Sequence, residues 1–138
     1  MLQTDLERYA NAPAVLVQIY VDRIVLHYPS STEYLTECAQ FSHPRSLLGD
    51  FSIAETTLTQ LLKRGGGGFK YLAPYMFIQA MERMECGLTQ VEIRALQELG
   101  LSSGARAIAI YDETGKLLTP NSLPATINLK RLAMMGLI

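Results

Sequence analysis

The chain has 138 residues, of which 49% are hydrophobic and 18% are charged, so we expect one folded domain over residues 1–138 rather than a disordered chain. Twelve Lys and Arg residues against thirteen Asp and Glu residues give a net charge of −1, which excludes a broadly basic nucleic-acid binder. Two cysteines exclude a disulfide framework, and the longest apolar stretch, 71–81, is too short to span a bilayer, so we expect a soluble cytoplasmic protein.

The first part of the sequence predicts a short helix followed by strands. Residues 2–10 can form a helix that ends before Pro13. Strand-forming residues then fill 14–28, where β-branched side chains alternate from Val15 to Val21. The alternation changes phase at positions 22 and 23, which predicts a bulge or a tight turn. One bent strand and two short strands both satisfy this pattern.

The apolar residues in the middle of the sequence follow no clear period before the helix predicted over 54–64. Residues 32–41 fit neither the helical nor the strand period, so helix and strand both stay open there. A helix over 54–64 is predicted because Ser52 and Glu55 match a capping box. Gly65 supplies the expected end of this helix.

Four further segments complete the predicted elements. Residues 72–86 predict a helix, because apolar side chains at 77, 78, 81 and 84 fall on one helical face. A second helix over 90–99 is expected to start with a Thr89–Glu92 capping box. Residues 105–118 predict a hairpin with a left-handed glycine at position 115, and 123–135 predict a last helix.

These elements predict an α+β fold. A small mixed sheet would combine the strand region 14–28 with the hairpin 105–118. About four helices, near 54–64, 72–86, 90–99 and 123–135, would cover one face of it. The residues expected in the core are Val17, Ile19, Val21, Leu58, Leu61, Phe77, Ile78, Met81, Ile93, Leu96, Ile108, Ile110, Ile127 and Leu132.

A glycine run beside basic residues is the clearest candidate ligand site. Glycines let backbone amides approach an anion, and neighbouring cations add attraction. The residues of this candidate anion site are Lys63, Arg64, Gly65, Gly66, Gly67, Gly68 and Lys70. The other interpretation, which we favour, is a flexible glycine-rich loop over 64–69 that only connects two helices.

No catalytic or metal-binding pattern emerges from the titratable residues. Metal ligands at tight paired spacing are absent. Cys38 and His43 lie five residues apart in a stretch broken by Pro44, and this spacing does not assure the hydrogen bond that a Cys–His nucleophilic pair requires. We therefore expect no catalytic residue, no metal and no cofactor. We interpret Cys38 as a packed structural cysteine and His27 as a residue on the polar face of the sheet.

Two segments resemble known families. The stretch GDFSIAE at 49–55, followed by LAPYMFIQAM at 72–81, resembles the strand-then-central-helix passage of hot-dog acyl-thioester enzymes. That resemblance implies a long helix wrapped by a sheet and an active site at a dimer interface, with no residue here at a matching catalytic position. The stretch SLPATINLKRL at 122–132, with its exit at 136–138, is similar to the recognition helix of winged-helix DNA-binding domains, which implies a DNA-binding helix. Its only basic residues are Lys130 and Arg131, too few to supply affinity through phosphate contacts.

The leading functional expectation is a small interaction or regulatory module without catalytic activity. It would bind a protein partner or a second copy of itself as a homodimer, because many Met and Tyr residues with low charge are favoured in interfaces. The expected contact residues on the C-terminal helix are Leu129, Leu132, Met135, Leu137 and Ile138. The alternative is a ligand-binding or enzymatic domain for a phosphate-bearing molecule such as an acyl thioester of coenzyme A. A winged-helix-like DNA binder comes third, and we expect neither a membrane nor a nucleic acid as partner.

Overall fold

The computed structural model describes residues 2–8, 13–28, 34–42, 47–65, 74–82 and 88–118. The helices in these ranges are α1 (Leu2–Arg8), α2 (Phe51–Gly65) and α3 (Gln90–Ser102). The strands are β1 (Ala14–Tyr20), β2 (Arg23–His27), β3 (Tyr34–Cys38), β4 (Tyr75–Ala80) and β5 (Ala107–Tyr111). None of these helices has both the length and the apolar content that a membrane crossing requires.

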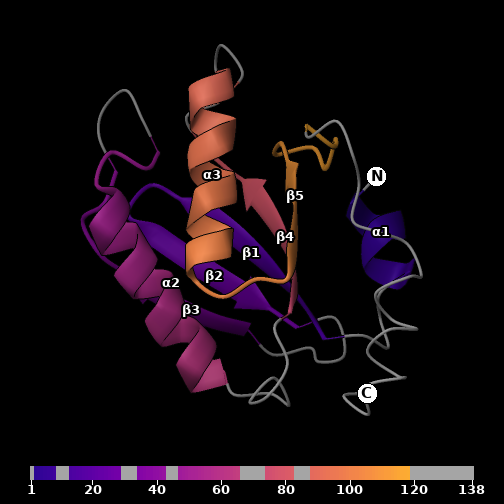
Figure 1. The fold of residues 1–138 in the computed structure, drawn as a ribbon, viewed down its shortest axis with the longest axis horizontal. Helices are drawn as coiled ribbons and strands as arrows, with labels where there is room; N and C mark the ends of the chain where they lie inside the picture. The colour runs from indigo at the N-terminus through magenta and orange to yellow at the C-terminus, as the bar shows by residue number, and fades with distance from the viewer. Residues whose placement is uncertain are drawn as a thin grey trace.

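The five strands form one mixed sheet in the order β3-β2-β1-β4-β5. Strands β1, β2 and β3 make an antiparallel meander, whereas β4 runs parallel to β1 and β5 runs parallel to β4. Figure 1 shows α2 and α3 lying across one face of this sheet. The short helix α1 packs on the opposite face, where Leu2 is buried with Tyr75 and Tyr111. The α+β class with a mixed sheet is confirmed, but two helices cover the face instead of four, and 123–135 lies outside the described residues.

The helix predicted over 72–86 is wrong, because Tyr75–Ala80 form strand β4 in the interior of the sheet. All six side chains of β4 are buried. A parallel strand that is covered on both faces has a continuous apolar sequence. Its sequence therefore lacks the alternation of apolar and polar residues that identifies a half-exposed strand. The same result overturns the hot-dog resemblance, since 51–65 are helical and 75–80 are a strand, the reverse of the implied order.

The strand region 14–28 consists of two strands, β1 and β2, joined by a turn at Val21 and Asp22. Asp22 has φ 53°, in the left-handed region that Asp tolerates better than most residues. The open question at 32–41 is answered by β3, which pairs with β2 over Tyr34–Cys38. The phase change in the sequence therefore marks a tight hairpin turn.

Helix α2 confirms the helix predicted over 54–64, but it begins earlier, at Phe51. The Oδ1 atom of Asp50 accepts a hydrogen bond from the Ile53 N–H at 3.2 Å. Asp50 is therefore the residue that caps the first turn, in place of the expected Ser52.

Thr89 is the N-cap of helix α3, as predicted. The Thr89 hydroxyl oxygen accepts from the Glu92 N–H at 3.2 Å and the hydroxyl lies 3.1 Å from the Glu92 carboxylate. The helix continues beyond its predicted end to Ser102, with Gly100 buried. A Cβ atom on Gly100 would lie 2.6 Å from Cδ1 of Ile108, so a glycine here allows α3 to lie close to β5.

The hairpin predicted over 105–118 is present in part. Strand β5 pairs with β4, and the returning segment makes a single antiparallel bridge between Tyr111 and Leu117. Gly115 has φ 89°, which confirms the left-handed glycine at this turn.

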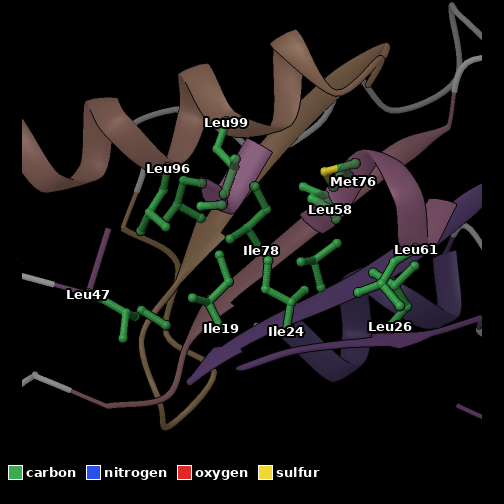
Figure 2. Packing of buried hydrophobic residues seen from close by; sticks show 14 of the residues in the cluster. Ile19, Ile24, Leu26, Leu47, Leu58, Leu61, Met76, Ile78, Leu96 and Leu99 are labelled. Atoms are coloured by element: carbon green, nitrogen blue, oxygen red, sulfur yellow. The ribbon is translucent and has the colours of Figure 1, made fainter. Parts of the chain in front are cut away.

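The main core lies between the sheet and the two long helices. Figure 2 shows Leu96 and Leu99 of α3 and Leu58 and Leu61 of α2 directed at the side chains of β1, β2 and β4. The predicted core residues that are buried are Val17, Ile19, Leu58, Leu61, Phe77, Ile78, Ile93, Leu96 and Ile110. The predicted core residues that are only partly buried are Val21, Met81 and Ile108. Ile127 and Leu132 lie outside the described residues.

Candidate interaction site

Strand β3 is an edge of the sheet, and its hydrogen-bond pattern defines which backbone groups face outward. In an antiparallel pair, residues that bond across the pair alternate with residues that do not. Ala39 donates its N–H to the Asp22 carbonyl at 3.1 Å, one step beyond the paired strands, so every second residue back along β3 also bonds β2. The N–H and C=O groups of Tyr34, Thr36 and Cys38 therefore point away from the sheet, and no strand within the described residues pairs with them, which is the arrangement that a further strand can extend.

Arg64 at the end of α2 reaches this edge. Its guanidinium forms an ion pair with Glu37 of β3 at 2.5 Å, and its second nitrogen lies 3.5 Å from the Thr36 carbonyl oxygen. The Arg64 and Glu37 side chains are 51% and 41% exposed, so solvent screens this pair and it contributes little stability. The contact to Thr36 is long and replaceable by a better-placed N–H donor.

The side chains of the outward-facing residues line the sheet face opposite α2 and α3. Leu35 packs on the main core, and side chains alternate along a strand, so Tyr34, Thr36 and Cys38 share the other face. Tyr34 is 62% exposed, and its ring centroid lies 5.7 Å from that of His27. Cys38 is exposed, which corrects the expectation of a packed cysteine. Among the described strands, β3 has a neighbour on one side only, so none of them covers this side chain from the other.

A cation–π contact extends this face toward the β1–β2 turn. The Arg23 guanidinium carbon lies 4.2 Å from the centroid of the Tyr20 ring. Arg23 is exposed and is the β2 residue opposite Cys38. Strand β3 is therefore bordered on this face by an aromatic pair at one end and a cation at the other.

A chain of side-chain hydrogen bonds crosses the same face from β2 to β4. His27 Nε2 lies 2.8 Å from Gln18 Oε1, and Gln18 Nε2 donates to Gln79 Oε1 at 2.9 Å. Gln79 in turn donates to the carbonyl oxygens of Asp112 and Glu113, at 3.1 and 3.3 Å. Because carbonyl oxygens only accept, they determine the donor direction of the whole chain.

That direction defines the proton on His27. Gln18 presents its carbonyl oxygen to the imidazole, so Nε2 carries the hydrogen in the neutral ring. Burial lowers the pKa of His27 below its ordinary value. The expected place of His27, on the polar face of the sheet, agrees with this arrangement, and the chain of amides orders the surface next to β3.

Asp22 attaches the β1–β2 turn to the segment that follows β3. Its Oδ1 atom accepts from the N–H groups of Phe41 and Ser42, at 3.0 and 2.7 Å. The Ser42 hydroxyl oxygen accepts from the Asp22 N–H at 3.0 Å and the hydroxyl donates to the Leu47 carbonyl at 2.7 Å. These bonds hold the Cys38 end of the edge strand in place.

The structure places three residues of the candidate anion site. Lys63, Arg64 and Gly65 belong to the last turn of α2. The guanidinium of Arg64 is engaged by a carboxylate, and a Cβ on Gly65 would lie 2.0 Å from the Tyr28 hydroxyl oxygen, so this glycine lets Tyr28 pack on the helix end. The predicted site residues outside the described part of the chain are Gly66, Gly67, Gly68, Lys70, Leu129, Leu132, Met135, Leu137 and Ile138.

A second surface feature is a shallow apolar groove of about 130 Å³ beside α3. Its lining residues are Leu47, Leu48, Leu88, Val91, Glu92, Ala95 and Leu96. Val91 is 78% exposed at this groove. Among the described residues, no group of three or more His, Cys, Asp and Glu side chains is arranged to hold a metal ion.

The edge residues of β3 were not among the sequence candidates. In the structure, side-chain burial alternates along Tyr34–Cys38, but the sequence of 32–41 fits neither the helical nor the strand period. The edge position of β3 depends on a strand order that no local pattern contains. No protein-family model matches the chain, and a search of curated proteins finds no match.

Proposed function

We propose that this protein is an interaction module that binds an extended segment of a partner polypeptide by strand addition at β3. The observation that supports the proposal is the set of outward-facing N–H and C=O groups of Tyr34, Thr36 and Cys38 at the sheet edge. An exposed row of this kind is a template for another strand.

The neighbouring side chains would select the partner sequence. In strand addition, main-chain hydrogen bonds give affinity and alternate side chains of the added strand give specificity. An added strand would direct every second side chain to the face that carries Tyr34, Thr36 and Cys38. Aromatic and β-branched side chains would pack best beside Tyr34.

The test is selection from a library of short peptides against the full chain, followed by amide hydrogen exchange with a selected peptide bound. We expect slower exchange at the outward-facing amides of Tyr34, Thr36 and Cys38. Thr36→Pro removes the central donor while the ladder to β2 is kept, so it should abolish binding. Thr36→Ala keeps the donor and should bind normally. Unchanged binding by the proline variant, or protection confined to the groove beside α3, would contradict the proposal.

A further inference from the structure

We propose that the strand docked on β3 is β3 of a second copy of this chain, paired antiparallel about a two-fold axis at Thr36. The inference rests on the strand-docking function and names its partner. The two five-stranded sheets would then join into one continuous sheet.

Hydrogen-bond parity favours this register. In an antiparallel pair, a residue whose backbone groups point outward must face another such residue. With the two copies of Thr36 opposite each other, Tyr34 of each copy faces Cys38 of the other. All three outward-facing residues of β3 are then bonded, whereas a shift of the axis to a neighbouring residue leaves one of them without an opposite residue in β3.

The side chains at the edge are compatible with self-pairing. Thr–Thr pairs across neighbouring strands are favourable, and the exposed Tyr34 ring would lie beside the Cys38 sulfur, a favourable contact for an aromatic ring. β3 contains no Lys and no Pro, two residues that commonly protect an edge.

The charges at the edge also complement each other. Each copy brings one Arg64–Glu37 pair, so two arginines and two glutamates gather around the axis with no net charge. The N–H of the second copy's Thr36 would replace the guanidinium at the Thr36 carbonyl, where the present distance is 3.5 Å. Arg64 would then be released toward the carboxylate of the second copy.

The first test is sedimentation and light scattering of the full chain across the micromolar range. We expect a concentration-dependent dimer, and Thr36→Pro should weaken it at least about tenfold, since two hydrogen bonds at the axis are lost. Thr36→Ala is the matched control and should dimerise like the parent. Arg64→Glu should weaken the dimer, and adding Glu37→Arg in the same chain should restore it. A dimer unaffected by the proline variant would overturn the proposal.

Cross-linking tests the register itself. Thr36→Cys in a Cys38→Ser, Cys86→Ser background places two thiols opposite each other at the axis, with Cα atoms about 5.5 Å apart, a separation that suits a disulfide. The Cys86→Ser variant alone keeps Cys38, whose copies would be four residues apart along the strands, or about 13 Å. We expect rapid cross-linking only in the first variant, and equal rates in the two would refute the register.

Failure of self-pairing can be distinguished from failure of strand docking at β3. If the chain stays monomeric while library peptides still protect the β3 amides, self-pairing is wrong and strand docking stands. If neither a second copy nor any peptide protects those amides, both proposals fail.

Discussion

Replacing Asp22 should destabilise the protein through two separable effects, one from its backbone and one from its carboxylate. Its φ of 53° is unfavourable for Ala by about 1–2 kcal/mol, whereas Asn tolerates it and Gly adopts it freely. Its Oδ1 accepts from the N–H groups of Phe41 and Ser42, and bonds to a charged acceptor contribute about 1.5–3 kcal/mol each. Asp22 is half-buried, so we use the lower end of that range.

The expected losses in unfolding free energy follow from these values. Asp22→Ala removes both hydrogen bonds and places Ala at an unfavourable positive φ, so we expect it to lose about 4 kcal/mol of unfolding free energy. Asp22→Gly removes the same bonds, but glycine adopts positive φ without cost, so we expect a loss of about 3 kcal/mol. Asp22→Asn keeps an oxygen acceptor, and Asn also tolerates positive φ. Hydrogen bonds to an uncharged acceptor are weaker, so we expect this variant to lose only about 1 kcal/mol of unfolding free energy.

Urea unfolding at neutral pH, with equal m values required for the comparison, measures the series. Amide hydrogen exchange should show faster exchange at Phe41 and Ser42 in the Ala and Gly variants and little change in the Asn variant. An Asn variant as unstable as the Ala variant would refute the role of the acceptor. Ala and Gly variants of equal stability would refute the backbone contribution.

Three further predictions concern the core, the end of α2 and pH. Gly100→Ala should cost about 1–2 kcal/mol in urea unfolding, because the new Cβ would lie 2.6 Å from the Ile108 Cδ1 atom, and Ile108→Val should recover part of the loss if that contact is the cause. Gly65→Ala should lower the midpoint of thermal unfolding because its Cβ would lie 2.0 Å from the Tyr28 hydroxyl oxygen, and the effect should shrink in a Tyr28→Phe chain. Burial lowers the pKa of His27 in the folded state, so its contribution to stability is complete above the unfolded value of about 6.5 and is lost as pH falls through the lower folded pKa. Unfolding at about pH 7.5 and 5.5 should therefore show a smaller drop in a His27→Gln variant than in the parent, and equal drops would contradict this assignment.

The local elements could be predicted from the sequence where one signal dominated. Thr89 caps the N–H of Glu92, and Leu58 and Leu61 of α2 lie on one buried face, because both signals act within a few residues. The alternation from Val15 to Val21 identified β1 for the same reason. Neighbouring side chains decide these features, so one segment of sequence contains the necessary information.

Strand β4 and the candidate site could not be predicted in this way. Burial on both faces gives Tyr75–Ala80 a continuous apolar sequence, and the same residues also fit a helical face. The outward direction of the Thr36 backbone depends on its pairing with β2, and the position of β3 at the edge depends on strand order. Both are relations between distant segments, and periodicity within 32–41 does not contain them.

Because β4 pairs with β1 across 61 positions of sequence, we expect this pairing to form late in folding. The meander of β1, β2 and β3 closes through short connections, while β4 must wait for the crossover through α2, and non-local pairing of this kind forms slowly. During synthesis, one side of β1 therefore remains open until residue 80 has left the ribosome. The step that buries Phe77 and Ile78 is also the step that ends this period of exposure to misassembly.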